Sequence, residues 1–190
     1  MKAIDVFDDA RVPGDVFQQL FSATLGGPVC PQLKSLTWTT LHRWDNAQKF
    51  FSPHLVSVCF AERGERRPYT DPILTSTISL LPTTHLEGLH LLRLPSSPRI
   101  QSAVSEVVQR LNTCLRRLST GPPLSDAAWE HLASLPRLKC LWVSNTPSTK
   151  TLRSAPYGIT FPALEQARIT VDDPCQHWSF LFSLLRSSPL

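Results

Sequence analysis

A short apolar phrase recurs six times and dominates the hydrophobic pattern of the chain. In each copy a leucine stands three residues before a leucine, valine or alanine, and in five copies another apolar residue follows two positions later. The copies span 33–38, 55–60, 86–91, 115–118, 138–143 and 164–169. Alternation of apolar and polar residues over so few positions is typical of strands with one buried face. The phrases therefore predict six strands.

Segments with helical periodicity lie between these strands. The clearest covers 98–111, where Ser97 can cap the helix and Pro98 occupies its first position. Its apolar residues fall on one helix face and are Ile100, Val104, Val107, Val108 and Leu111. Further helices are predicted over 71–81, 125–135 and 173–185, and shorter ones over 14–24 and 44–51. Their apolar residues are, in the same order, Leu74, Ile78 and Leu81; Ala128, Leu132 and Leu135; Trp178, Leu181, Phe182 and Leu185; Val16, Phe17, Leu20 and Phe21; and Trp44, Ala47 and Phe51. Loops are predicted over 61–70, 95–97, 120–124 and 144–160, the last of which is rich in proline, serine and threonine.

The order of helix, turn and strand predicts an α/β fold built from repeats. Successive first leucines are 22, 31, 29, 23 and 26 residues apart, close to the period of about 20 to 29 residues in leucine-rich repeats. A unit this small cannot bury its own apolar face, so neighbouring units must stack. We expect an irregular leucine-rich-repeat solenoid over 31–190, with about six repeats, a parallel sheet on the concave side and helices on the convex side. Residues 1–30 are predicted to form a helical flank or cap.

The strand register predicts which side chains face outward on the concave side. The residues on either side of the second apolar position should point away from the helices. Among these outward residues, the candidates for binding a partner are Trp142, Arg168, Arg117, His90 and Gln166. Tryptophan and arginine are the types most enriched at binding hot spots. The alternative is that the 144–160 loop covers Trp142 and that the arginines are merely solvated.

Two stretches resemble a known family, the leucine-rich-repeat region of fungal F-box-type proteins. They are Cys30-Pro-Gln-Leu-Lys-Ser-Leu36 and Leu135-Pro-Arg-Leu-Lys-Cys-Leu141, and the resemblance extends from Pro31 to Leu190. It implies a substrate receptor of a ubiquitin ligase, in which an N-terminal F-box binds an adaptor and the repeats bind the protein to be modified.

The chain departs from the family pattern in two respects. Regular repeats carry asparagine or cysteine eight residues after the first leucine, but here those positions hold Leu41, Arg63, Leu94, Pro123, Thr146 and Asp172. No F-box pattern precedes the first repeat, so an adaptor is expected to bind only if an F-box lies outside this chain. Because the ending Ser187-Ser-Pro-Leu190 resembles the start of another strand, we expect the chain to be truncated.

Composition narrows the functional classes. The net charge is only +4, the N-terminus is acidic where a secretory signal would be apolar, and no stretch is long enough for a membrane helix. We expect an intracellular protein, cytoplasmic or nuclear. The five cysteines lack paired spacing and are interpreted as reduced structural thiols. Because no phosphate-binding loop, nucleophile elbow or metal motif occurs, no catalytic residue, cofactor or metal is predicted.

Three hypotheses follow for function. The first is a noncatalytic protein-protein interaction module that binds an unidentified partner through its strand face. The second is nucleic-acid binding through the arginine-bearing segments, with Arg63, Arg66, Arg67, Arg116 and Arg117 as contacts. The third is a truncated remnant without activity.

Overall fold

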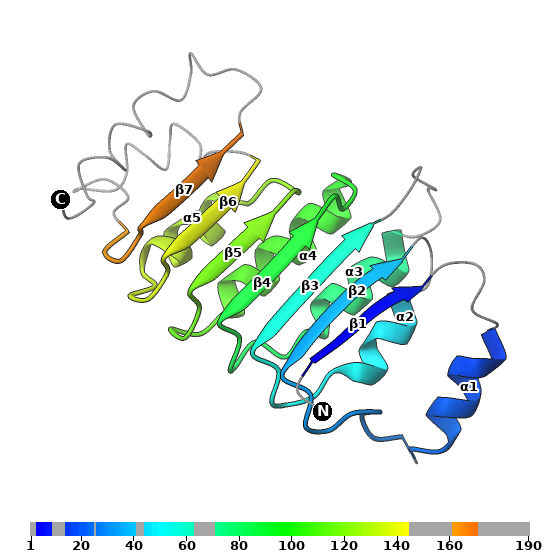
Figure 1. Ribbon diagram of the computed structural model, residues 1–190. Helices are drawn as coiled ribbons and strands as arrows, with labels where there is room; N and C mark the ends of the chain where they lie inside the picture. Colours follow the sequence, from blue (N-terminus) through cyan, green and yellow to red (C-terminus); the bar gives the residue numbers. More distant parts are fainter. Residues whose placement is uncertain are drawn as a thin grey trace.

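The computed structural model describes residues 3–8, 14–24, 26–40, 44–62, 71–144 and 161–170. Within these ranges the chain forms an open, seven-stranded parallel sheet whose strands follow the order of the sequence (Figure 1). The strands are β1 (Ala3–Asp8), β2 (Ser35–Thr40), β3 (Ser57–Glu62), β4 (Gly88–Leu92), β5 (Arg117–Thr120), β6 (Cys140–Val143) and β7 (Gln166–Ile169). The helices are α1 (Gly14–Ser22), α2 (Trp44–Ala47), α3 (Asp71–Ser79), α4 (Pro98–Arg110) and α5 (Asp126–Ala133). The predicted α/β class and parallel sheet are confirmed.

A tight turn precedes each of the six predicted strands. In the first copy the Leu33 N–H donates to the Cys30 carbonyl, which closes a turn with Pro31 at its second position. Proline favours that position because its ring fixes φ near the value that the turn needs. The same hydrogen bond starts the copies at Leu55, Leu115, Leu138 and Leu164. The first leucine of each phrase therefore packs inside the turn, and the strand begins two residues later.

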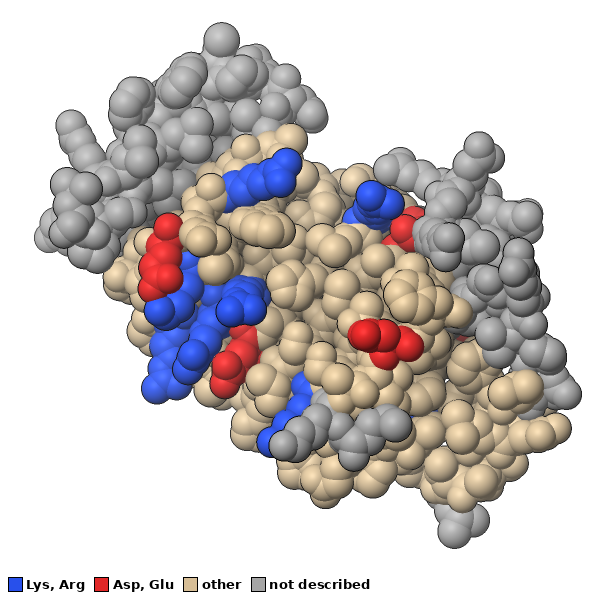
Figure 2. Space-filling view, viewed as in Figure 1, with Lys and Arg blue, Asp and Glu red and all other residues tan. Residues whose placement is uncertain are grey.

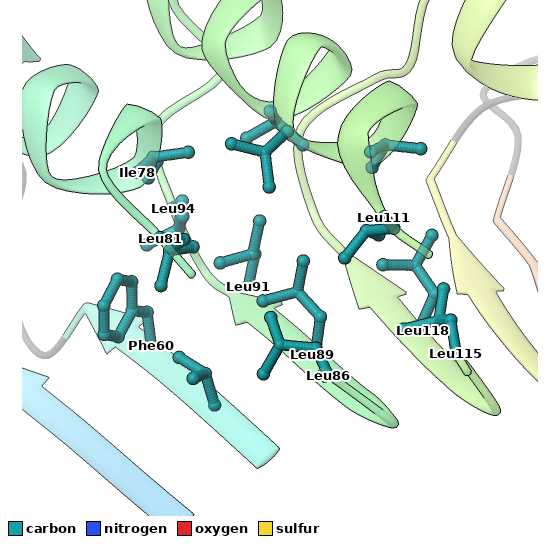
Figure 3. Close-up of a cluster of buried hydrophobic side chains, with 14 of the residues drawn as sticks. Phe60, Ile78, Leu81, Leu86, Leu89, Leu91, Leu94, Leu111, Leu115 and Leu118 are labelled. Carbon is teal, nitrogen blue, oxygen red and sulfur yellow. The ribbon is translucent and has the colours of Figure 1, made fainter. Parts of the chain in front are cut away.

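The strands align in register, so equivalent residues form rows across the sheet. One row runs through Leu36, Val58, Leu89, Leu118 and Leu141, all of which are buried. The first leucines form a parallel buried row at the beginning of the strands. Figure 3 shows how the leucines of β4 and β5 meet Phe60 of β3, Ile78 of α3, and Leu81 and Leu111, which follow α3 and α4. The main core is therefore continuous between the sheet and the helices.

The helices α2 to α5 lie on one face of the sheet (Figure 1). Helix α4 buries the predicted residues Ile100, Val104, Val107 and Val108, and the Ile100 N–H donates to the Ser97 hydroxyl oxygen at 3.4 Å. Helices α3 and α5 likewise bury their predicted apolar residues. No described helix covers the opposite face of the sheet, which we call the open face.

Some elements differ from the sequence-based expectations. Strand β1 is not among the predicted strands, because residues 1–30 are expected to form a helical flank. In α1, Phe17 packs against Trp38 with 6.0 Å between ring centroids, whereas Val16 and Leu20 of the predicted face are exposed. Phe50, rather than Phe51, is deeply buried after α2, because the helix tightens to a 3-10 turn over Gln48–Phe50. The predicted helix 173–185 and loop residues 145–160 lie outside the described residues.

Two carbonyls in the segment after β5 are bonded by side-chain hydroxyl groups. The Thr120 hydroxyl donates to the Pro122 carbonyl at 3.1 Å, and the Ser144 hydroxyl donates to the Gly121 carbonyl. Leu94, one of the positions at which regular repeats would carry asparagine or cysteine, is instead buried in the core. Individual hydroxyl groups thus satisfy the backbone here.

Candidate functional site

Two rows of side chains project from the open face. The first row, in strand order, is Ala3, Ser35, Ser57, Gly88, Arg117, Cys140 and Gln166. The second row is Asp5, Thr37, Cys59, His90, Ser119, Trp142 and Arg168. Both rows begin with short side chains, and the larger polar and aromatic groups gather over β4 to β7. The sheet register thus places the side chains that are candidates for binding at one end of the open face.

The open face is hollowed over these strands. Two adjoining cavities of about 580 and 230 Å3 share His90, Arg116 and Arg117 in their linings. The larger cavity is also lined by Leu118, Ser119, Lys139, Cys140, Trp142, Glu165 and Gln166. The smaller one is completed by Val56, Ser57, Glu87 and Gly88. Because they share three residues, we treat the two cavities as one site and call it the polar hollow.

Gly88 creates the smaller part of the hollow. It is the residue of β4 that would otherwise project a side chain between Ser57 and His90. A Cβ atom at this position would lie 3.3 Å from Ser57 Oγ and 3.8 Å from His90 Nε2. Glycine inside a strand weakens it and often marks a close approach by another group. A side chain at this position would therefore crowd Ser57 and His90, which line the same cavity as Arg117.

Charged side chains at the strand beginnings pair across neighbouring repeats. The residue after each first leucine offers a carbonyl that accepts the N–H groups of two residues in the next repeat, at 2.8 to 3.1 Å. This repeated bonding places Glu87 beside Arg116, with 3.5 Å between Oε2 and Nε, and Lys139 beside Glu165, with 2.5 Å between Nζ and Oε1. From β4 to β7, the charges at this position therefore run negative, positive, positive, negative.

Arg117 adds a positive charge that is not neutralised by an ion pair. No described residue forms an ion pair or a hydrogen bond with its guanidinium group. Figure 2, which views the open face, shows the basic side chains gathered over the beginnings of β5 and β6, with acidic side chains beside them. The centre of the hollow is therefore cationic although its two margins are acidic.

The surroundings of His90 affect the protonation of its imidazole. Partial burial, and secondarily the positive charge of Arg117, lower the pKa of its imidazole below the ordinary value. A neutral imidazole keeps one nitrogen as an acceptor and the other as a donor. The arrangement favours a neutral His90 beside a cationic Arg117 until an anion approaches.

Trp142 supplies the apolar wall of the hollow. Its side chain is 45% exposed, in contrast to Trp38, Trp44 and Trp129 of the core. Ser119 lies between His90 and Trp142 in the same row and is only 5% exposed, as expected for a small side chain between two rings. An exposed indole next to cationic and amide groups can contact apolar and polar parts of a ligand together.

The structure brings together four of the five predicted site residues. His90, Arg117, Trp142 and Gln166 line the polar hollow. Arg168 is the register neighbour of Trp142 on β7 and is exposed outside that lining. That these residues bind a partner stays a prediction.

Four lining residues were not predicted for the strand face: Glu87, Arg116, Lys139 and Glu165, of which Arg116 was considered only for nucleic-acid binding. The predicted outward residues are those next to the second apolar position, whereas these four follow the first leucine. Aligning the six copies and comparing that one position would have revealed opposite charges in neighbouring repeats.

Other chemistry is not assembled in the described part of the chain. No group of three or more metal-ligating side chains occurs among the described residues. Within the same ranges, no helix has both the length and the apolar character needed to cross a membrane. Of the arginines considered for nucleic-acid binding, Arg63, Arg66 and Arg67 lie outside the described residues, and Arg116 is paired with Glu87.

A scan against protein-family models found no match, and a search of curated proteins found none similar to this chain. Any functional assignment therefore depends on the fold and on the polar hollow.

Proposed function

We propose that the protein is a noncatalytic protein-binding module with an irregular leucine-rich-repeat architecture, related to the substrate-binding repeats of F-box-type receptors. The repeated unit of turn, leucine and strand, and the in-register parallel sheet that it builds, support the repeat architecture. Solenoids of this kind present extended surfaces to their partners. In this protein the surface is the open face over β4 to β7. If an F-box accompanies the chain, its partner is a substrate for ubiquitination.

The observation that carries this proposal is the exposed indole of Trp142 in a polar hollow. A large, exposed aromatic side chain loses unfavourable contact with water when a partner covers it. Tryptophan and arginine dominate the binding energy of many protein interfaces, and here Trp142 and Arg117 line the same hollow. The surrounding polar side chains can form the rim that excludes water from such a contact.

A substitution at Trp142 tests this role. Full-length wild-type protein and Trp142→Ala would be used to capture partners from cell extract, with chemical cross-linking and mass spectrometry as the readout. We expect the variant to lose the specific partners, because truncating a hot-spot tryptophan costs about 2 kcal/mol or more of binding free energy.

Leu80→Ala provides the matched control. Leu80 follows α3 on the helical side of the molecule and is 58% exposed, so its truncation removes a similar exposed apolar group far from the open face. The proposal requires Leu80→Ala to capture the same proteins as the wild type. Equal capture by Trp142→Ala and by the wild type would contradict it.

A further inference from the structure

Arg117 is the group in the polar hollow with unused binding capacity. The two cations beside it, Arg116 and Lys139, are already paired with Glu87 and Glu165. Arg117 lines both parts of the hollow and has no ion-pair partner among the described residues. The smaller cavity, whose lining includes Gly88, adjoins Arg117 and gives a ligand room at this end of the hollow. A complementary ligand therefore carries one localised negative charge.

We propose that the polar hollow binds an extended acidic segment of a partner protein, with one carboxylate on Arg117 and an apolar side chain on Trp142. This inference rests on the proposed protein-binding function and specifies the chemistry of the partner. A guanidinium presents two parallel N–H donors that match the two oxygens of a carboxylate. The indole of Trp142 offers the adjoining apolar contact.

The charge pattern selects against a nucleic acid. A polyanion crossing the hollow would meet carboxylates at both ends of the cationic pair, at Glu87 and at Glu165. Glu87 and Glu165 stand three strands apart in the sheet, which is about 14 Å at about 4.8 Å per strand, so a nucleic-acid backbone that crossed the hollow would pass both acids. A single carboxylate can occupy the centre without meeting either repulsion. Among its described lining residues the hollow offers Arg117 as the one arginine or lysine outside an ion pair, and its single positive charge matches the single negative charge of a carboxylate.

The sheet register also predicts the spacing of the two ligand side chains. Arg117 lies directly beside Cys140 on the next strand, and Trp142 lies two residues further along that strand. Such diagonal neighbours are roughly 7 to 8 Å apart. In an extended peptide, side chains on the same face are two residues apart, which is about 7 Å. The acidic and apolar residues of the partner should therefore stand at positions i and i+2.

Selection from a displayed library of random peptides on the immobilised full-length protein tests this inference. We expect the selected peptides to share Asp or Glu two residues from an apolar residue. In fluorescence anisotropy titrations, replacing that acid by its amide should weaken binding to the wild type about tenfold or more, because a charge-assisted hydrogen bond is lost. The variant Arg117→Gln should bind the acid and amide peptides equally.

Arg168→Gln is the matched control, since Arg168 is exposed on the same face but outside the lining of the hollow. It should keep the preference for the acid. Arg117→Gln should retain the wild-type thermal unfolding midpoint, because Arg117 is exposed. An acid preference that survives Arg117→Gln overturns the inference, as does stronger binding of a phosphorylated peptide or of single-stranded DNA.

The outcomes separate this inference from the function on which it rests. Peptides that lose binding in Trp142→Ala but show no preference for the acid would refute the acidic partner and leave the protein-binding function standing. If neither peptides nor cellular partners depend on Trp142, the proposed function fails as well.

Discussion

His90 is the side chain of the open face whose protonation the fold opposes. Burial is the main cause and Arg117 the second, and both lower the pKa of the imidazole. Arg116 and Glu87 also line the part of the hollow that contains His90, and their mutual ion pair limits the net charge that they add. On unfolding, burial and the fixed proximity of Arg117 are lost, so the pKa returns toward its ordinary value of about 6.5. The unfolded state therefore binds this proton more readily.

We expect His90 to lower the stability of the protein in acid. As pH falls through about 6.5 toward the lower pKa of the folded state, the unfolded state gains protons first, so the free energy of unfolding decreases. Above that window both states are neutral at this position and the effect vanishes. Urea denaturation of wild type and His90→Asn between about pH 8 and about pH 5 measures it. The wild type should lose stability relative to the variant as pH falls.

Arg117 provides a control for the cause. The same two proteins, with His90 and with His90→Asn, would be compared again in an Arg117→Gln background. The difference in their free energies of unfolding should then depend less on pH, because one of the two causes of the lowered pKa has been removed. A wild type that gains stability over His90→Asn in acid would contradict the direction of the shift.

At the scale of the element, helix α4 connects sequence and structure most directly. Its apolar residues recur at helical spacing and cover the sheet, and its first turn is closed by Ser97, with Pro98 next in the chain. Proline at this position lacks an N–H that would have no partner within the helix. The Ser97 hydroxyl accepts the Ile100 N–H that would otherwise be unpaired. Local chemistry thus determines where α4 begins.

Removing this cap should destabilise the protein. We expect Ser97→Ala to lower the free energy of unfolding by about 1 kcal/mol, because the Ile100 N–H loses its acceptor. Ser97→Asn should retain most of the stability, since asparagine also caps helices. Ser96→Ala is the control: Ser96 is exposed and accepts a hydrogen bond from Gln101 through its carbonyl, which the substitution preserves. Chemical denaturation would refute the cap if Ser96→Ala and Ser97→Ala were equally destabilising.

The elements that sequence predicted are those whose signal is local. Helices α1 to α5 and strands β2 to β7 all lie in segments with apolar periodicity or turn residues of their own. Strand β1 contains alternating Ile4 and Val6 but lacks the leucine phrase, and its pairing with β2 is a tertiary property. The shift of burial from Phe51 to Phe50 depends on a change of helix type, which periodicity cannot specify.

The candidate site was predictable to a similar extent. Period-two alternation placed His90, Arg117 and Trp142 on one face, because that rule needs only the strand positions. Two features of the site depend on which residues of neighbouring strands are adjacent. They are the lack of an ion-pair partner for Arg117 among the described residues and the cavity that Gly88 helps to line. Which residues become adjacent depends on how repeats of unequal length stack in register. The sequence shows the repeats but does not show this stacking.

At the scale of the whole molecule, the sheet order means that each strand pairs only with its neighbours in sequence. Within the described residues, β1 has one sheet partner, whereas β4 and β5 each have two. Stability in such an array is approximately the sum of the repeat terms and the nearest-neighbour terms. A defect in a central strand should therefore weaken the two adjoining strands before it reaches the more distant ones.

Leu89→Ala tests this coupling in the middle of β4. Leu89 is fully buried between Val58 and Leu118 in the row that faces the helices. Its truncation should cost about 2 to 5 kcal/mol, through lost burial and the cavity that remains. Hydrogen exchange measured by mass spectrometry should accelerate in β3 and β5 more than in β1, because the missing contacts adjoin those two strands.

Leu92→Ala is the matched control, since Leu92 lies on the same strand but faces the open side and is 37% exposed. Its effect on stability should stay within about 0.5 kcal/mol, as is usual for exposed positions, and exchange in β3 and β5 should not change. If Leu89→Ala accelerated exchange uniformly from β1 to β7, the sheet would unfold as one cooperative unit and the nearest-neighbour description would be wrong. A graded response centred on β4 would instead mean that a partner bound over β4 to β7 stabilises mainly the repeats it contacts.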